Sequence, residues 1–378
     1  MVWEFATAGR LLFGEGAVSA LRNILPTFGP RFAIVTGASQ RFLSLIRTEV
    51  AYCPDASLHV VTMAAEPSVQ QVEQAAFEAV GFQATCLIGI GGGSSMDAAK
   101  AIAVLVPNGC LAKPFLEVVG EGKALENPPL PVVAIPTTAG TGSEVTRNAV
   151  LCSGEVKVSL RDHRMLPRVA VVDPLLAHSL PQEQTAAGGL DALTQLIEPF
   201  LSPASTPFTD ALCREALPRI ANSLRRAWKT GSDRDARRDM ALAATLSGMA
   251  LANARLGAVH GLAGPLGGLI KAPHGELCAR LLPPVMRVNY DATIQNPVVQ
   301  GRFSEIATLL IGEPNPGALF EWLEDLTGTF AIRGLGAMGL RRQDIPLVAT
   351  RALQSSSMKG NPARLPAASL ENILHTAW

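Results

Sequence analysis

The sequence predicts an α/β N-terminal domain built on a mostly parallel sheet, followed by an all-helical C-terminal domain. In the first half, short apolar runs alternate with helix-length connections. After Asp173 and Pro174, strand-like runs become rare and helical patterns dominate. The length of 378 residues also exceeds what one hydrophobic core usually serves. We place the boundary near residue 175, which gives expected domains at 1–175 and 176–378.

Five apolar runs predict the strands of the sheet, at residues 32–36, 58–62, 85–90, 131–135 and 169–172. Residues 69–80 and the stretch from Met96 onward have helical spacing between these runs. Strands joined by helix-length connections are typical of a parallel sheet with helices on both faces.

The second half predicts long helices. Apolar side chains recur at helical spacing at Leu217, Ile220, Leu224 and Trp228. We expect Pro218 to split or kink this helix. Residues 240–254 form a second apolar helix, and a third is expected to begin after Gly188 and Gly189.

Composition excludes several classes of function. Lys and Arg together number 32, as do Asp and Glu, so the formal net charge is zero and no nucleic-acid or anionic-membrane surface is expected. No signal peptide is recognisable at the start, and the aliphatic run 101–106 is too short to span a bilayer. Six scattered cysteines without a CxxC pair indicate reduced thiols, and therefore a cytoplasmic protein.

A glycine-rich turn follows the strand at 85–90. Gly91, Gly92 and Gly93 let the backbone turn tightly and approach a ligand without Cβ clashes. The helix that follows presents free N–H groups and a positive dipole end, which suit a pyrophosphate, and Ser94 or Ser95 can cap it or donate to phosphate. The string is not GxGxxG, and a glycine-rich turn without a ligand stays open as an alternative.

A second polar loop follows the strand at 131–135. Residues 136–146 carry five hydroxyls and two glycines, more than a chain reversal needs. Hydroxyls at the carboxyl end of a parallel strand suit ribose and phosphate contacts, although a Thr-rich capping loop is the alternative. The two loops together predict a Rossmann-like dinucleotide-binding domain.

At these two loops the chain resembles the iron-containing (group III) alcohol dehydrogenases. GGGSSMDAAK and PTTAGTGSEVT match the two cofactor motifs of that family, and GGLDALTQLIE, VHGLAGPLGGLIKAPHG and the closing NPARLPAASLENILHTAW extend the resemblance over nearly the whole chain. The resemblance implies a nicotinamide-dependent oxidoreductase that transfers a hydride between NAD(P) and a small alcohol, aldehyde or ketone. It also implies a homodimer.

The resemblance assigns the cofactor residues one by one. The glycine motif wraps the pyrophosphate, the Thr-rich loop lines the nucleotide, and one lysine reaches the ribose. The residues so implied are Gly92, Gly93, Ser94, Asp97, Thr137, Thr138, Thr141 and Lys157. Lys157 taken alone is also compatible with a solvated surface lysine.

The residue after the first strand bears on the choice of cofactor. An acidic residue there accepts from the ribose 2′-OH and repels a 2′-phosphate, and NAD-preferring relatives often carry Asp. Here the position holds Gly37, with Ser39 and Arg41 available to hold a phosphate. This pattern favours NADP.

The resemblance also implies a divalent metal, iron or zinc. The family pattern Asp-x-x-x-His is met by Asp191 but ends in Gln195, while His260 and His274 match the other two ligands. Residues four apart share one helical face, so Asp191 and Gln195 can point at the same spot. A glutamine oxygen ligates more weakly than imidazole, so the alternative is that no metal binds and Gln195 donates a hydrogen bond to a substrate carbonyl.

The sequence leaves other functions open. Where the family commonly has a second histidine in His-Gly-x-Ala-His, this chain has Gly264, which predicts a roomier site without that proton relay. A metal-independent reductase resembling the maleylacetate reductases is one alternative, although Asp191 counts against it. A lyase resembling dehydroquinate synthase and a catalytically silent nucleotide-binding protein are the others. The working hypothesis gives catalytic roles to Asp191, His260 and His274.

Overall fold

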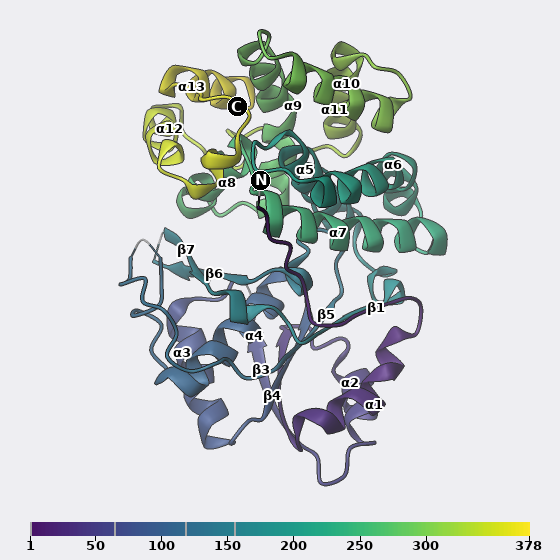
Figure 1. The fold of residues 1–378 in the computed structure, drawn as a ribbon, viewed down its shortest axis with the longest axis vertical. Helices are drawn as coiled ribbons and strands as arrows, with labels where there is room; N and C mark the ends of the chain where they lie inside the picture. The colour runs from purple at the N-terminus through teal and green to yellow at the C-terminus, as the bar shows by residue number, and fades with distance from the viewer. Residues whose placement is uncertain (1, 64–65, 118, 155) are drawn as a thin grey trace. The chain divides into compact units, whose positions relative to one another are not determined.

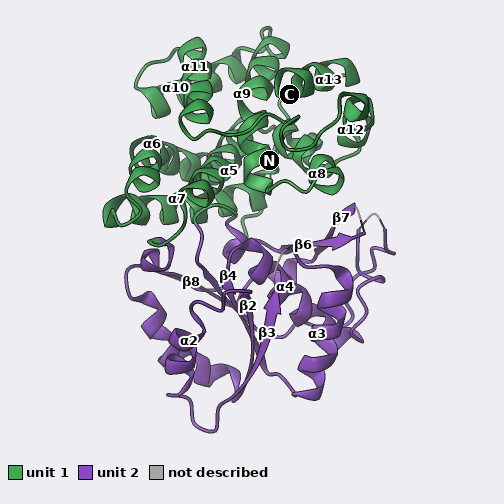
Figure 2. Cartoon of the chain, turned by 180° about the vertical axis from the view of Figure 1, so that it is seen from behind, with its two compact units in different colours: residues 1–6, 139–141, 178–378 green, residues 7–138, 142–177 purple. Residues whose placement is uncertain are grey.

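The computed structural model describes residues 2–63, 66–117, 119–154 and 156–378. Within them the chain forms two compact units, coloured separately in Figure 2. One unit comprises residues 7–138 and 142–177, and we call it the sheet unit. The other comprises residues 1–6, 139–141 and 178–378, and we call it the helical unit.

The sheet unit is built on six parallel strands in the order β1-β8-β5-β4-β2-β3. Figure 1 labels β1, β3, β4 and β5 among them, and Figure 2 labels β2 and β8. Its strands are β1 (Leu11–Phe13), β2 (Arg31–Gly37), β3 (Ser57–Met63), β4 (Cys86–Gly91), β5 (Val132–Pro136) and β8 (Val169–Val172). The helices between them are α1 (Leu21–Ile24), α2 (Leu43–Val50), α3 (Val69–Gly81) and α4 (Gly93–Leu105). All five predicted strands are present, and the predicted fold class is confirmed.

Side chains alternate between two apolar layers because successive residues of a strand point to opposite faces. In β2, Phe32 and Ile34 pack in the cluster that includes α1 and α2. Ala33 and Val35 pack in the cluster that includes α3 and α4 on the other face. Burial on both faces explains why these strands read as continuous apolar runs.

A two-stranded antiparallel hairpin, β6 (Asn148–Ser153) and β7 (Val156–Arg161), was not predicted. Its residues alternate between buried and partly exposed, as expected for a hairpin with one packed face. Leu151 and Leu160 join the apolar cluster that includes α4. Strand β1 was also missed, because only three residues pair with β8.

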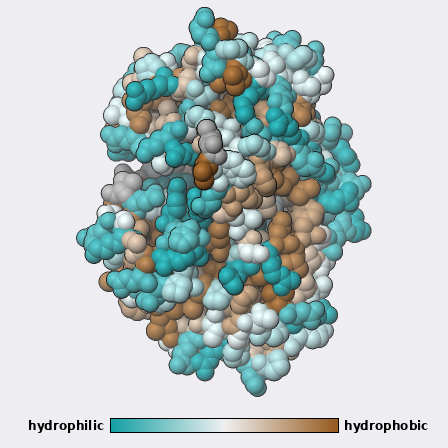
Figure 3. Space-filling model, in the orientation of Figure 1, coloured by the Kyte–Doolittle hydropathy of each residue, from teal (hydrophilic) through white to brown (hydrophobic). Residues whose placement is uncertain are grey.

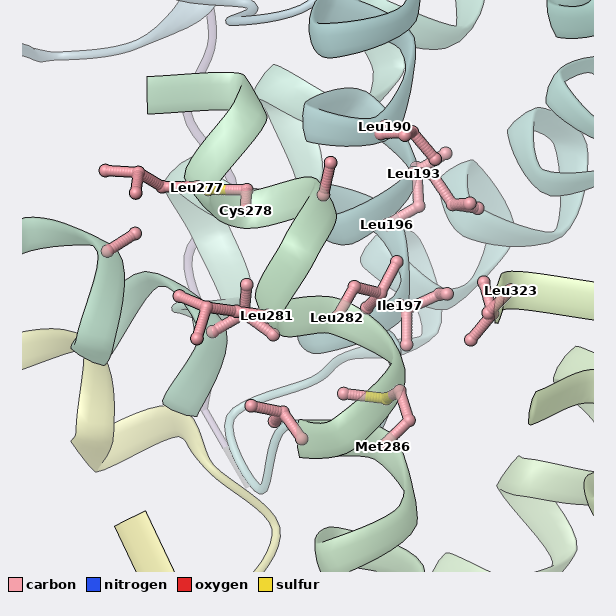
Figure 4. Packing of buried hydrophobic residues seen from close by; sticks show 14 of the residues in the cluster. Leu190, Leu193, Leu196, Ile197, Leu277, Cys278, Leu281, Leu282, Met286 and Leu323 are labelled. Carbon is pink, nitrogen blue, oxygen red and sulfur yellow. The ribbon is translucent and has the colours of Figure 1, made fainter. Parts of the chain in front are cut away.

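The helical unit contains nine helices within the described residues. They are α5 (Gln182–Leu201), α6 (Pro207–Lys229), α7 (Arg234–Ala254), α8 (Ala258–Leu269), α9 (His274–Ala292), α10 (Pro297–Ile311), α11 (Pro316–Thr329), α12 (Ile345–Leu353) and α13 (Ala367–Thr376). Leucine, isoleucine and methionine side chains from α5 and α9 meet in its core, as Figure 4 shows.

Two details of the helical prediction were wrong. Helix α5 begins at Gln182 and not after Gly189, since both glycines lie inside it and serve packing. A Cβ on Gly189 would lie 2.2 Å from a methyl carbon of Leu224. Helix α6 runs through Pro218 as one element, so the predicted split is wrong, and a kink at Pro218 stays a prediction.

Figure 3 shows hydrophilic residues spread over one face, with hydrophobic residues interspersed among them. Among the described residues no single helix has both the length and the apolar character to cross a membrane, while α7 and α8 together, bent by 99°, satisfy these criteria.

Candidate functional site

The glycine-rich turn lies where the strand order reverses. From β2 the chain goes outward to β3 and then returns to the other side of β2 with β4. In open parallel sheets, ligands bind outside the carboxyl ends of the strands at this point. Gly37 ends β2 and Gly91 ends β4 there, and a Cβ on Gly91 would lie 3.8 Å from the Gly37 nitrogen.

Glycine is required at Gly91 for two reasons. Its φ is +151°, a conformation that L side chains rarely adopt, and a Cβ would lie 2.5 Å from Ser95 Oγ. Gly92 then serves as the N-cap residue of α4. No side chain caps this helix end, so its first amide groups are available to an anion.

Gly92 differs from Gly91 because an added Cβ would meet only Thr138, at 3.5 Å or more. This is an ordinary contact, so the unliganded fold does not require glycine there. A ligand that approaches the backbone closely would require it. Thr137 lies beside this turn, and its backbone N–H donates to the Gly91 carbonyl at 2.9 Å.

Asp97 and Lys100 form a polar network beneath the glycine turn. Asp97 accepts a hydrogen bond from Ser143 Oγ and another from the Val150 N–H at 3.0 Å. Lys100 Nζ lies 3.1 Å from Asp97 Oδ1 and donates to the Ser143 carbonyl and to Thr146 Oγ1. Burial lowers the pKa of Lys100 even though Asp97 and Glu144 act to raise it.

This network ties α4 to the second polar loop and to β6. It gives Asp97 a structural partner for each carboxylate oxygen. The predicted contact of Asp97 with the cofactor stays a prediction. The sequence analysis did not single out Lys100. Its indication in the sequence was a charged side chain within the Ala-rich run of α4.

Lys157 and Thr141 are two further candidates for cofactor binding, and their surroundings differ. Lys157 on β7 forms an ion pair with Glu66, and only 12% of its side chain is exposed. Thr141 falls in the helical unit, together with residues 139 and 140. Their predicted contacts with the nucleotide stay predictions.

The turn after β2 leaves space at Gly37, where the lack of a carboxylate predicts a preference for NADP. A Cβ on Gly37 would meet no atom within 4 Å. Gln40 has a φ of 47°, and its side chain donates to Thr62 Oγ1 at 2.9 Å. Ser39 and Arg41 lie exposed in this turn, where they are accessible to a ligand.

The helical unit brings the predicted metal ligands together. Asp191 lies on α5, His260 on α8 and His274 at the start of α9. Asp191 Oδ1 lies 3.4 Å from His260 Nε2 and 3.9 Å from His274 Nε2. A fourth residue that the sequence did not single out, Cys278, joins them, and one ligand atom from each of the four lies within 4.8 Å of the others.

Glu198 fixes the orientation of the His260 ring. It lies seven residues after Asp191 on the same face of α5 and is 2% exposed. Glu198 Oε2 lies 2.7 Å from His260 Nδ1, so Nδ1–H donates to the carboxylate and Nε2 is left without a proton in the neutral ring. A carboxylate behind a histidine in this way is typical of metal ligands.

Two buried atoms of this cluster have no hydrogen-bond partner. They are Asp191 Oδ1 and His260 Nε2, and they face each other at 3.4 Å. A buried polar atom without a partner costs free energy, so such atoms call for a ligand. The donor set of a carboxylate, two imidazoles and a thiol fits a divalent metal such as zinc.

The electrostatics of the cluster favour a cation. Burial acts to lower the pKa of His260, but Cys278 and Glu198 outweigh it and raise that pKa well above its usual value. Cys278 likewise raises the pKa of His274. Burial acts to raise the pKa of Cys278, but His260 and His274 lower it overall. The same negative potential that favours protonated imidazoles attracts a metal ion.

Gln195 makes a different contact from the one expected. Its Oε1 accepts a hydrogen bond from Ser247 Oγ on α7 at 2.9 Å. Ser247 Oγ also lies 2.8 Å from the Ala244 carbonyl oxygen, so its single proton is shared between the two acceptors. The side chain is buried, at 4% exposure. Ligation of a metal by Gln195 stays a prediction.

Glycines allow the three helices to approach one another. A Cβ on Gly275, next to His274, would lie 2.5 Å from the Ala187 carbonyl oxygen of α5. A Cβ on Gly257, before α8, would lie 2.9 Å from Glu198 Oε1. Gly264 is the exception, because a Cβ there meets no atom within 4 Å. Protein atoms therefore leave room at Gly264, and its part in a roomier substrate site stays a prediction.

Comparison with known families covers both units. The family described as "Iron-containing alcohol dehydrogenase" matches residues 8–174, and the one described as "Fe-containing alcohol dehydrogenase family, C-terminal" matches residues 185–378.

Similar proteins have related descriptions. "Alcohol dehydrogenase 4" of Saccharomyces cerevisiae is 39% identical over 296 residues, which cover 77% of this chain and 75% of that protein. "NAD-dependent methanol dehydrogenase" of Bacillus methanolicus is 33% identical over 388 residues and covers 97% of both chains. The crystal structure of a 1,3-propanediol oxidoreductase superposes with a TM-score of 0.90 at 32% identity and covers 100% of both chains.

Proposed function

The chain belongs to the iron-containing alcohol dehydrogenase family and is an oxidoreductase, and we propose that it interconverts a small alcohol and its aldehyde or ketone with NAD(P) and a divalent metal held by Asp191, His260 and His274. The observation that carries the metal-dependent form of this proposal is the pair of unpartnered buried atoms, Asp191 Oδ1 and His260 Nε2.

The sheet unit carries the residues that we propose to bind the cofactor. The uncapped start of α4 and the close-approach position at Gly92 support pyrophosphate binding by Gly92, Gly93 and Ser94. The Thr137 and Thr138 hydroxyls follow β5 at the same edge of the sheet, which suits nucleotide contacts.

The helical unit carries the residues that we propose to hold the metal. When bound, the reduced nicotinamide provides the hydride and the metal polarises the carbonyl oxygen. Asp191 contributes a carboxylate whose pKa, despite burial, is lowered by His260 and His274, so it stays ionised. Glu198 keeps His260 Nε2 free to ligate. His274 is 34% exposed and leaves the cluster accessible to a small substrate.

We propose that NADP is preferred to NAD. The support is the open position at Gly37, which carries no carboxylate to repel a 2′-phosphate, and the exposed Ser39 and Arg41 nearby. Titration with NADPH and NADH tests this preference directly, and tight NADH binding without NADPH binding contradicts it.

We also propose that the protein works as a cytoplasmic homodimer. All six cysteines are free thiols, which supports a reducing compartment. The homodimer rests on the family resemblance, and light scattering of the purified protein tests it. A monomer at micromolar concentration contradicts it.

The decisive experiment on metal dependence uses Asp191→Ala and His274→Ala. Each variant is expected to lose bound metal and turnover together, while retaining NADPH binding, because the glycine-rich turn with Gly92, Gly93 and Ser94 lies in the other unit. Elemental analysis, NADPH titration and aldehyde reduction are measured on the same preparations. Full turnover in either metal-free variant favours the metal-independent reductase. Cofactor binding without turnover on any aldehyde favours the silent nucleotide-binding protein.

A further inference from the structure

Cys278 occupies a position that no other described cysteine shares. It lies one helical turn after His274 on α9, so both side chains emerge on the same face of the helix. Figure 4 shows Cys278 on α9 beside the leucine-rich core against α5. Its exposure is 0%. A small apolar residue would satisfy the packing there, but the sulfur lies 3.6 Å from His274 Nε2.

The spacing of the four candidate donors fits one tetrahedral ion. A tetrahedral zinc ion with bonds of about 2.0 Å to nitrogen or oxygen and about 2.3 Å to sulfur holds two nitrogen or oxygen ligands about 3.3 Å apart and a sulfur about 3.5 Å from each of them. The separations in this cluster are 3.4 Å, 3.9 Å and 3.6 Å, of which the first and third match and the second is wider. They join Asp191 to His260, Asp191 to His274, and His274 to Cys278.

Gln195, in contrast, is already engaged. Its Oε1 lies 2.9 Å from Ser247 Oγ and accepts from that hydroxyl. Gln195 is also neutral, whereas a deprotonated thiol brings a negative charge to the ion. Asp191 and His260, by contrast, have a sulfur ligand atom, that of Cys278, within 4.8 Å of their own ligand atoms.

We propose that Cys278, and not Gln195, supplies the fourth protein ligand, so that the site is Asp-His-His-Cys and selects zinc over ferrous iron. This assignment rests on the proposed metal-dependent function. Soft thiolate ligands favour zinc among the divalent ions. The charge of the ion is then balanced by the Asp191 carboxylate and the Cys278 thiolate. Gln195 acts as a bridge between α5 and α7.

The test measures the coordination of zinc directly. The full chain is loaded with one equivalent of zinc, and the X-ray absorption fine structure at the zinc edge is recorded. We expect one sulfur neighbour at about 2.3 Å together with nitrogen and oxygen neighbours at about 2.0–2.1 Å. Cys278→Ser is expected to lose the sulfur signal, and Cys213→Ala, a control at another buried cysteine on α6, is expected to keep it.

Zinc affinity gives a second readout. Loss of an orienting partner behind a ligand costs about 10–100-fold in affinity, so loss of a ligand itself is expected to cost on the order of 100-fold or more. Cys278→Ser is expected to show this loss. Gln195→Leu is expected to keep the sulfur signal and stay within about tenfold of the parent, because Ser247 retains its bond to Ala244.

The outcomes separate this assignment from the proposed function. One bound zinc with turnover but no sulfur neighbour overturns the role of Cys278 alone. The same holds if Gln195→Leu weakens zinc binding and Cys278→Ser does not. If the parent protein binds ferrous iron at the site but no zinc, this assignment fails and the metal-dependent function stands. If it binds neither ion, both fail. A sulfur neighbour lost only in Cys278→Ser establishes the assignment.

Discussion

Glu198 and His260 form a buried carboxylate–imidazole pair, with 2.7 Å between Oε2 and Nδ1. The second oxygen of Glu198 accepts from the Val259 N–H at 2.6 Å, so the carboxylate is anchored at the start of α8. This arrangement holds the ring and sets its tautomer. Because Glu198 takes the Nδ1–H, Nε2 is the ring nitrogen that would ligate a metal ion at the cluster.

Glu198→Gln is therefore expected to weaken metal binding about 10–100-fold. The amide no longer fixes the tautomer of His260, although it keeps the size of the side chain. Competition with a chromophoric chelator measures the affinity. Circular dichroism of the metal-free protein checks that the fold is retained. An unchanged metal affinity in a folded variant contradicts the role given to Glu198.

Gly92→Ala tests the cofactor turn. An added Cβ meets protein atoms only at 3.5 Å or more, so the melting temperature is expected to stay close to that of the parent. A bound pyrophosphate approaches this backbone, so NADPH affinity is expected to fall by about tenfold or more, equivalent to about 1.4 kcal/mol. The matched control is Gly81→Ala at the end of α3, where a Cβ also has space. Equal NADPH affinity in both variants argues against pyrophosphate binding at Gly92.

Gly37→Asp tests the choice between the two nicotinamide cofactors. The position has room for a side chain, and a carboxylate there repels the 2′-phosphate of NADPH and accepts from the 2′-OH of NADH. The ratio of kcat/KM for NADPH over NADH is expected to fall by about 10- to 100-fold. Gly37→Asn is the uncharged control and should change the ratio less. If Gly37→Asp leaves the ratio of kcat/KM for NADPH over NADH unchanged, the proposed preference for NADP is contradicted.

Gly264→Leu tests the space near the cluster. Gly264 follows His260 by one helical turn, and nothing lies within 4 Å of an added Cβ. The fold should tolerate the change, since glycine within a helix costs up to about 1 kcal/mol relative to alanine. We expect KM to rise more for bulky aldehydes than for small ones. Gly261→Leu provides the contrast, because its Cβ would lie 2.4 Å from Met358 Sδ and should destabilise the protein. Identical KM changes for all aldehydes would falsify the assignment of this space to substrate.

The sequence predicted the parallel sheet because its central strands are apolar on both faces, as in β2 and β4. It misplaced the start of α5 because Gly189 reads as a helix boundary. The glycine instead accommodates Leu224, a contact made by a distant part of the chain. Tertiary packing of this kind has no local signal.

The site was predicted only in part for a similar reason. Asp191, His260 and His274 were found through a family pattern, whereas Glu198 and Cys278 were not. Both had a local signal, since Glu198 lies seven residues after Asp191 and Cys278 four residues after His274. That signal acquires meaning only when α5, α8 and α9 are seen to converge.

Metal-assisted, nicotinamide-dependent carbonyl reduction is checked by a single NADPH-oxidation assay. Oxidation of NADPH, followed by its absorbance, is recorded with a panel of small aldehydes before chelation, after removal of metal, and after one equivalent of zinc or ferrous iron is returned. We predict turnover that is lost on chelation and restored by the metal, with NADPH binding unchanged throughout. Full turnover in the demetallated protein contradicts the account.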